Sequence, residues 1–410
     1  MRRTLVASLV LLAALAMPAR SQPSAGWAYN PDAGATYRRG DVRATVWGFA
    51  ERNWGPHSVV VTADAWRRVR QGAELDLPRF HVRAIAASVR PLLVYEVDLT
   101  DNNFFRAGRR SQVFENAYVA LQHGDDPARG RVLVGENTHI LSREDNLSSG
   151  NLPTINRSLI LEEHGSVNSF GTQWGVEAFR AVTPRVSLAI SAQDNRGSFN
   201  TANPRYVIGN SMAAKVSTIA LDDPRRGRLT VGLGADYTRN IRDRTFALAS
   251  AIGAEPFGGA PAEGNKRSLE GDVSYAGLTP LPFTDGMHPY AIDAEMLVSK
   301  FSATGTDVGG GYVQLQLSVF DSPEHGDLDP FVRYDVVYLD RANMMGAAVQ
   351  HAARVGINYN LPRAHKFGSL HLEYAANRIA GPTAYVPARS RQTGEVRIGL
   401  RINATRYLRH

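Results

Sequence analysis

Strict alternation of apolar and polar residues constrains this fold more than any other feature of the chain. In the segment YVQLQLSVF, Val313, Leu315 and Leu317 alternate with Gln314 and Gln316. A period of two residues places the two sets on opposite faces of a β-strand. From about residue 58 onward such segments recur, and each ends in a cluster of Gly, Pro, Asn or Asp. The pattern predicts an all-β protein with many long strands.

Length and polarity decide between a soluble sandwich and a membrane barrel. Strands of a sandwich average about 5–6 residues, whereas transmembrane barrel strands need about 9–11. The segments are long and their opposite faces are polar, which favours a closed barrel that leaves no backbone edge in lipid. We therefore predict a 16-stranded antiparallel transmembrane β-barrel with strands near 59–69, 77–88, 91–100, 112–123, 129–137, 169–181, 184–192, 207–221, 228–239, 267–277, 289–301, 311–321, 330–339, 351–361, 368–378 and 394–404.

Some tyrosines near segment ends fall on the apolar side, as the interfacial girdle of such a barrel requires. They are Tyr237, Tyr275, Tyr312, Tyr338 and Tyr374. A seventeenth candidate strand at 42–51 breaks the even strand count expected of these barrels. We place it in a periplasmic N-terminal segment.

The N-terminus predicts export. Two arginines, an apolar run from Leu5 to Met17 and the small residues around Arg20 form a secretory signal peptide over residues 1–21. The run is too short for a spanning helix, which needs about 20 residues. The predicted order is then the signal peptide, an N-terminal periplasmic segment over 22–57 and the barrel over 58–410. The predicted location is the outer membrane of a Gram-negative bacterium.

Charge and cysteine content exclude some functions. The chain has 46 Lys+Arg, 39 Asp+Glu and no cysteine, so stability must come from a large fold and not from disulfides. Removing residues 1–21 lowers the formal charge from +7 to +4, which is a weak surplus, and we predict no nucleic-acid partner. The expected partners are outer-membrane lipid and small solutes or anions. No metal-ligand spacing occurs, and we predict no cofactor.

Residues 138–168 interrupt the alternation. In the strand count they join the fifth strand to the sixth, which makes them the third external loop. A connection of this length without strands is usually functional or disordered. Its apolar residues, such as Leu141, Leu159 and Ile160, predict packing against the barrel wall. We therefore expect the loop to fold inward and narrow a channel.

Charged residues of the loop are the candidate constriction residues: Arg143, Glu144, Asp145, Arg157, Glu162 and Glu163. The polar strand faces carry both signs of charge, and their candidate basic lumen residues are Arg79, Arg83, Arg131, Arg397 and Arg401. Rings of arginine in a narrow pore favour anions and rings of acids favour cations. The loop itself has more acid than base.

Five segments in order give a family resemblance over residues 77–181. FHVRAIAASV, LLVYEVDL, VFENAYVAL, the GRVLVGEN strand with its following loop, and FGTQWGVEA resemble the first half of the phosphate-selective porin O and P family. The loop core from Leu147 to Leu159 carries Arg157 at the position of a family arginine. The resemblance implies a trimeric 16-stranded outer-membrane channel that passes anions such as phosphate.

Two departures from that family bear on the solute. The chain has only four lysines, and its constriction loop is net acidic, so the porin architecture is better supported than phosphate selectivity. We predict passive diffusion of small hydrophilic solutes or ions and no enzymatic activity.

Two other functions stay open. One is a barrel enzyme resembling a lipase, using His164 with Ser166 or His371 with Ser369, although no catalytic motif such as G-x-S-x-G is present. The other is a structural or adhesive barrel with a plugged lumen.

Overall fold

The computed structural model describes most of the strands and part of the long loop. The described residues are 26–30, 34–40, 42–56, 63–82, 87–100, 114–123, 129–147, 152–154, 157–161, 172–194, 210–241, 262–282, 286–322, 324–341, 347–361, 368–381 and 392–403. The predicted signal peptide lies outside them. Within these ranges no helix is long and apolar enough to cross a membrane.

All strands in the described residues belong to one sheet, and every pair of neighbours is antiparallel. They are β1 (Gly26–Asn30), β2 (Gly34–Arg39), β3 (Val42–Pro56), β4 (Ala63–Asp76), β5 (Phe80–Val82), β6 (Ala87–Thr100), β7 (Phe114–His123), β8 (Gly130–Thr138), β9 (Thr172–Ala181), β10 (Val186–Asp194), β11 (Ser211–Asp223), β12 (Gly227–Ile241), β13 (Gly264–Pro280), β14 (Met287–Phe301), β15 (Thr306–Leu317), β16 (Phe320–Ser322), β17 (Gly326–Arg341), β18 (Ala348–Asn360), β19 (Gly368–Ala380) and β20 (Gln392–Asn403).

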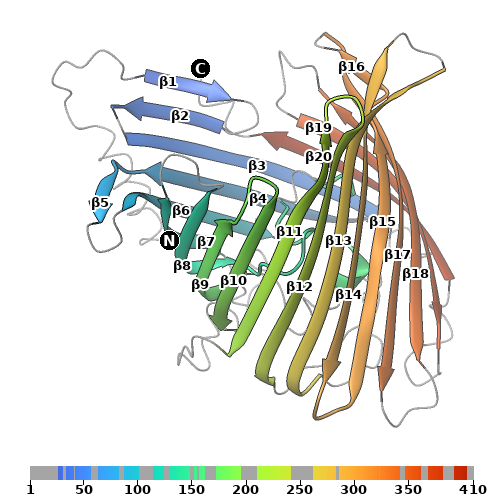
Figure 1. Cartoon of the computed structure of the whole chain (residues 1–410). Coiled ribbons are helices and arrows are strands. Elements are labelled where there is room, and N and C mark those ends of the chain that lie inside the picture. Colours follow the sequence, from blue (N-terminus) through green and yellow to red (C-terminus); the bar gives the residue numbers. More distant parts are fainter. Residues whose placement is uncertain are drawn as a thin grey trace.

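The strand pairings form a ring. Each long strand pairs with its neighbour along the chain, and β20 pairs with β3 through Ile398–Asn403 and Phe49–Trp54. Short β5 continues β4 along β6, and β16 continues β15 along β17. The hairpin of β1 and β2 lies beside the first half of β3, away from the wall of long strands (Figure 1). The remaining sixteen of the 20 described strand segments make the ring, which confirms the predicted 16-stranded barrel.

The two faces of the wall have the polarity that a membrane demands. Leu233, Leu269 and Met296 point outward with 67%, 59% and 63% of their surface exposed. On the same strands Asp236 and Glu270 point inward and are buried. A soluble protein would bury its apolar face, whereas a lipid-facing barrel exposes it. The alternation in the sequence is therefore confirmed as apolar outside and polar inside.

Tyr312 is an exception to the predicted aromatic girdle. Tyr275, Tyr338 and Tyr374 lie on the outward face as predicted, but Tyr312 shares the inward face with Gln314 and is buried. The Arg333 guanidinium lies 3.9 Å from the Tyr312 ring centroid. The prediction placed Tyr312 outside because an apolar run follows it. Side chains alternate along a strand, so the position of Tyr312, two residues before Gln314, points it inward whatever its neighbours are.

The first strands correct the predicted domain boundary. Val42–Pro56 forms β3, the first strand of the ring, so this part of 22–57 belongs to the barrel, which begins before residue 58. The predicted strands 59–69 and 77–88 correspond to one ring strand, β4 with its continuation β5. Between them Leu77–Arg79 leaves the strand, where Pro78 has no N–H to donate. The structure adds β3 to the predicted ring and merges two predicted strands into one, so the number of ring strands remains sixteen.

Each of the other predicted strands overlaps one strand of the ring, so the long connections fall as expected. Residues 139–171 join β8, the fifth strand of the ring, to β9, the sixth. Residues 195–210 and 242–263 join later odd strands to even ones at the same end of the barrel. At the opposite end, the connection between β13 and β14 covers only 281–286 and is shorter than the predicted 278–288. The end with the long connections is the one predicted to be external.

Candidate functional site

The loop after β8 lies against the inner face of the wall. Its described residues are 139–147, 152–154 and 157–161. The Leu141 carbonyl accepts a 2.7 Å hydrogen bond from Lys215 of β11, and the Pro153 carbonyl accepts a 2.9 Å bond from Asn358 of β18. Both donors are on inward-facing positions of strands far apart in the ring. The loop therefore folds inward, as the sequence predicts.

Short polar side chains shape the first turn of the loop. The Ser142 hydroxyl accepts a 3.0 Å bond from the Asp145 N–H. The Asn146 amide donates to the His139 and Ser142 carbonyls at 2.8 and 2.6 Å. Ser and Asn favour turns because their side chains satisfy nearby backbone groups in this way. The turn places Glu144 where it can reach the wall.

Arg157 connects two arms of the loop, residues 139–147 and residues 157–161. Its guanidinium donates to the Glu144 carbonyl and, at 3.2 Å, to the Leu147 carbonyl. Its Nη1 also lies 3.6 Å from Asp145. Of the candidate constriction residues, Arg157 thus holds two arms of the loop together, and only 20% of its side chain is exposed.

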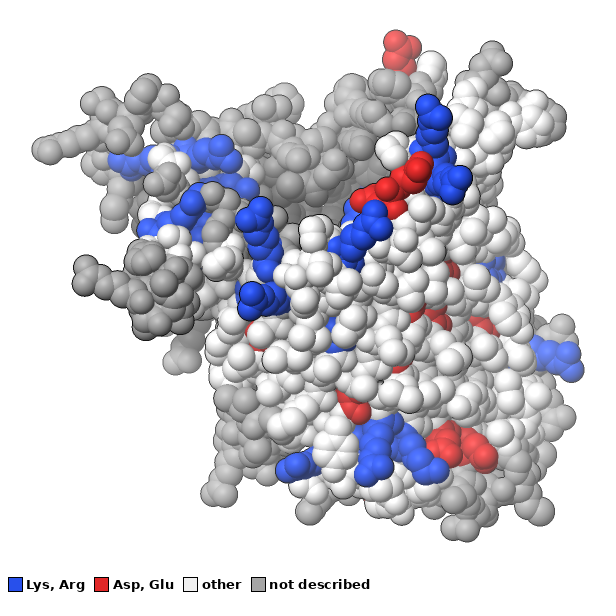
Figure 2. All heavy atoms as spheres, viewed as in Figure 1, with Lys and Arg blue, Asp and Glu red and all other residues white. Residues whose placement is uncertain are grey.

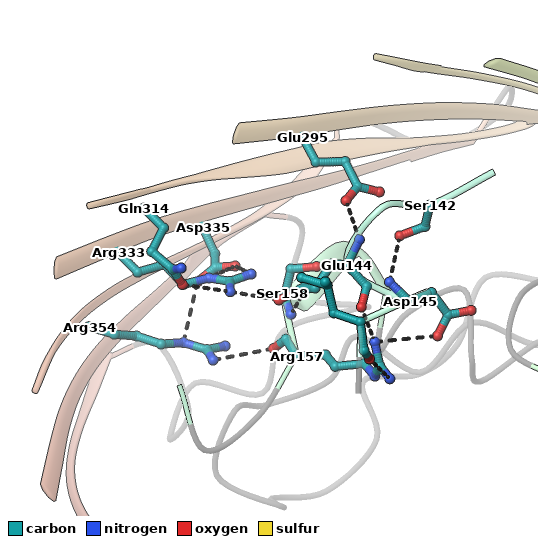
Figure 3. A network of polar contacts seen from close by, with 11 residues as sticks. Ser142, Glu144, Asp145, Arg157, Ser158, Glu295, Gln314, Arg333, Asp335 and Arg354 are labelled. Carbon is teal, nitrogen blue, oxygen red and sulfur yellow. Dashed lines mark hydrogen bonds and ion pairs between the residues drawn. The ribbon is translucent and has the colours of Figure 1, made fainter. Parts of the chain in front are cut away.

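Glu144 makes the central contact between loop and wall (Figure 3). One carboxylate oxygen accepts a 2.6 Å bond from the Arg333 guanidinium of β17, and the other accepts a 2.9 Å bond from the Ser158 N–H. The Glu144 N–H donates to Glu295 of β14 at 3.0 Å. Burial raises the pKa of Glu144, but Arg333, together with Ser158 and Arg157, holds that pKa below its usual value. Glu144 is thus a buried anchor that does not face the lumen.

Arg333 is itself held by the wall. Its Nε lies 3.1 Å from both Asp335 carboxylate oxygens, and its Nη1 donates to Gln314 at 3.3 Å. Arg354 of β18 lies 3.3 Å from Asp335 and donates to the Arg157 carbonyl at 3.2 Å. Figure 3 shows these side chains converging from three strands on one end of the loop. Arg333 and Arg354 thus pair with the buried carboxylates of Glu144 and Asp335.

A second attachment lies at the start of the loop. The fully buried His139 places Nε2 3.6 Å from Asp236 of β12, and Lys266 of β13 lies 3.2 Å from the same oxygen. The Leu141 N–H donates to His139 Nδ1 at 3.3 Å, so a neutral imidazole carries its proton on Nε2, facing Asp236. Burial is the main reason why the pKa of His139 is lowered to about 4; Asp236 opposes this shift, while Lys266 and Lys215 add to it.

Apolar side chains fill the space beneath the loop. Leu141, Leu159 and Ile160 are fully buried in one cluster with Phe301 and Val337, which lie near the long-connection half of the wall. Burial of each such side chain contributes about 1.5–3 kcal/mol. The loop is thus held by packing as well as by its ion pairs.

The other predicted site residues are divided between wall and loop. Arg143 lies 2.9 Å from Asp293 of β14, and 27% of its side chain is exposed, more than for Glu144, Asp145 or Arg157. Arg131 pairs with Glu177 at 3.3 Å, and Arg397 pairs with Glu373 and Glu395 on the inward face. Arg401 also lies inward and is almost buried. Glu162, Glu163 and Arg83 lie outside the described residues.

An arginine pocket was not predicted. Arg38, Arg43, Arg79 and Arg90 line a cavity of about 450 Å³ beside the short-connection end, and only Arg79 was among the candidates. Arg43 lies 3.2 Å from Glu74 and 2.5 Å from Asp76, and Arg90 lies 3.5 Å from Asp76. Two of the four arginines thus pair with these acids. The signal was the hairpin at Gly40, whose positive φ of 56° allows a tight turn and sets Arg38 opposite Arg43.

Metal chemistry has no support in the described ranges, where no group of three or more His, Cys, Asp or Glu side chains could hold an ion.

Comparison with known proteins gives the fold. No protein-family model matches the chain, and no curated protein matches it. Solved structures do match. A loop-deletion mutant of OmpT, an outer membrane protein of Vibrio cholerae, has a TM-score of 0.56 at 10% identity, covering 88% of this chain and 99% of that chain.

Two further structures are similar. The anion-selective porin from Comamonas acidovorans has a TM-score of 0.53 at 13% identity, covering 88% of this chain and 99% of its own. OmpF of Salmonella typhi, in complex with daunomycin, has a TM-score of 0.54 at 10% identity, covering 92% and 100%. At such identities the likeness carries the fold alone. That fold and the exposed apolar belt place the chain among the outer-membrane β-barrels of Gram-negative bacteria, which confirms the predicted location.

Proposed function

We propose that the protein is a porin for passive diffusion of small hydrophilic solutes or ions. The observation that carries the proposal is the inward loop, held on the polar inner face by Glu144 and Arg333. A loop folded inside the barrel narrows its lumen. The similar fold of an anion-selective porin and of OmpF supports the same function.

We further propose that anions are favoured over cations. The loop's described charges are largely neutralised by each other and by the wall, so the predicted acidity of the loop does not decide the field. The arginine pocket, in contrast, has four basic and two acidic side chains. We propose that the pocket lies at the short-connection mouth of the channel, where its arginines raise the local anion concentration. Phosphate, as the resemblance to the porin O and P family implies, is the candidate solute, and a homotrimer is the candidate assembly.

A barrel enzyme remains the second candidate because of one contact. Ser369 Oγ and His371 Nε2 on β19 lie 2.8 Å apart. In a hydrolase, a third group on Nδ1 orients the histidine, but His371 Nδ1 has no hydrogen-bond partner in the described part of the chain. Arg401 lies opposite Ser369 in the neighbouring strand, and its charge opposes the imidazolium that a general base must become. We therefore propose that the protein is not an enzyme.

Bilayer recording tests this function. We expect open channels in a planar membrane and a reversal potential of anion sign in a KCl gradient. Replacing the two exposed pocket residues, as R38Q/R79Q, should move the reversal potential toward cations, because two positive charges leave the proposed short-connection mouth of the channel.

The matched control is R267Q/K300Q, which removes two charges from the outer face and should leave the reversal potential unchanged. Absence of conductance would contradict the porin function and favour a structural or adhesive barrel. An unchanged potential in R38Q/R79Q would refute the role of the pocket while leaving the channel in place. Hydrolysis of lipid by wild type but not by S369A would favour the enzyme.

A further inference from the structure

Three basic side chains gather on the outside of the barrel, at the edge of its apolar belt. Arg239, Arg267 and Lys300 lie near the ends of β12, β13 and β14 that face the long connections. All three are exposed, and 69% of the Lys300 side chain is accessible. Figure 2 shows basic side chains gathered at the lower end of this face, with acidic side chains beside them, below a surface that is mainly uncharged.

The backbone register forces these charges together. Arg267 is the direct cross-strand partner of Lys300, and on its other side it is the partner of Tyr237. Arg239 lies over the Tyr237 ring, with its guanidinium carbon 5.7 Å from the ring centroid. Like charges directly opposite each other destabilise a sheet unless a counter-charge is supplied.

The chain supplies only part of that counter-charge among the described residues. Lys300 Nζ lies 3.4 Å from Asp307 of β15, a carboxylate that is itself 42% exposed. Asp340 of β17, which is also exposed, is the cross-strand partner of Asp307. Three basic side chains therefore face two acidic ones among the described residues, so this surface stays net positive and can attract an anionic group.

The position of the cluster along the membrane normal indicates which groups outside the protein can supply a counter-charge. On β13 the outward positions between Arg267 and Tyr275 are Leu269, Gly271 and Val273. The eight residue steps from Arg267 to Tyr275 span about 27 Å along the strand, or about 21 Å across the membrane for a typical tilt, close to the height of a barrel's apolar belt. Tyr275 and Tyr290, with ring centroids 5.6 Å apart, mark its opposite edge. The basic cluster therefore lies at the level of lipid headgroups.

We propose that Arg239, Arg267 and Lys300 bind the phosphate of a membrane lipid headgroup. Guanidinium groups bind phosphate oxygens with paired hydrogen bonds, and an ammonium group adds a point charge. Because the long connections are predicted to be external, the lipid is a phosphorylated lipid of the outer leaflet. This site is independent of the channel function.

Titration of purified, delipidated protein in detergent with lipid A tests the site. Wild type should bind bis-phosphorylated lipid A about 30-fold more tightly than R267Q/K300Q, as expected for two basic residues at a membrane surface. The matched control is R225Q/R226Q, which removes two exposed charges from the turn at the opposite end and should bind as wild type does. Heat-dependent gel mobility reports whether each variant is folded.

Two outcomes would overturn the proposal. One is equal affinity of wild type and R267Q/K300Q for lipid A. The other is equal affinity of wild type for lipid A and for its dephosphorylated form. Inorganic phosphate at matched ionic strength should not displace the lipid, and displacement would show that the site takes free phosphate instead.

Discussion

Replacing Arg333 by methionine should release the loop from the wall and raise the single-channel conductance. Arg333 is almost fully buried and bonds Glu144 at 2.6 Å and Asp335 at 3.1 Å. Its removal leaves both carboxylates buried without that cation. Breaking a buried ion pair from one side costs about 3–5 kcal/mol. The part of the loop around Glu144 should then move away from the wall, and the lumen should widen.

The measurement is the conductance in a planar bilayer together with protease cleavage of the loop in intact barrels. The matched control is R131M, since Arg131 also faces inward and pairs with Glu177 but lies on β8, away from the loop contacts. R131M should keep wild-type conductance. The double variant E144L/R333M should recover part of the lost stability, because it removes the unpaired Glu144 charge. Wild-type conductance and cleavage in R333M would show that the ion pair does not hold the loop.

Replacing Lys266 by methionine should destabilise the barrel by about 3–5 kcal/mol at neutral pH, and by less in acid. Lys266 and Asp236 are fully buried as a pair, and His139 faces the same carboxylate oxygen. In the wild type the pKa of His139 is about 4, below its unfolded value near 6.5. A depressed pKa gives stability above pH 6.5 that is lost as the pH falls toward 4.

Loss of Lys266 removes one of the charges that lower the pKa of His139, so that pKa should rise relative to the wild type. The imidazolium can then replace the ammonium beside Asp236. The stability gap between K266M and wild type should therefore narrow between pH 7.5 and 4.5, measured by urea unfolding in detergent with tryptophan fluorescence. K300M, at an exposed lysine, is the control and should show a small, constant gap. A constant gap in K266M would refute the coupling.

Much of the fold could be predicted because the membrane imposes polarity on every second residue. The alternation gave the inward and outward faces and fourteen of the ring strands from 91–100 onward. The alternation did not predict strand boundaries where residues have no apolar or polar side chain. The predicted strand at 311–321 begins in the structure at Thr306, because Gly309, Gly310 and Gly311 have no side chain to alternate.

Those glycines are required by close packing. A Cβ at Gly310 would lie 2.2 Å from the Val336 carbonyl oxygen, and one at Gly311 would lie 2.2 Å from the Glu295 carbonyl oxygen. Close approach of neighbouring backbones explains why the sequence departs from alternation there.

Within the site, the sequence identified the loop but not its partners. The break in alternation at 138–168 and its apolar residues predicted an inward, packed loop. Pairing of Glu144 with Arg333, 189 positions away, depends on the ring order and could not be predicted from local pattern. For the same reason Arg157 was predicted to line the constriction, whereas its guanidinium binds carbonyls of the loop itself.

Thiol modification inside the lumen tests the central claim most directly. The chain has no cysteine, so R143C introduces a single thiol at the most exposed described charge of the loop. A charged methanethiosulfonate should lower the current through open R143C channels in discrete steps, because it adds bulk in the narrowed lumen. L233C, on the lipid-facing side, should show no change. An unchanged current in R143C after confirmed labelling would contradict a loop that lies in the channel.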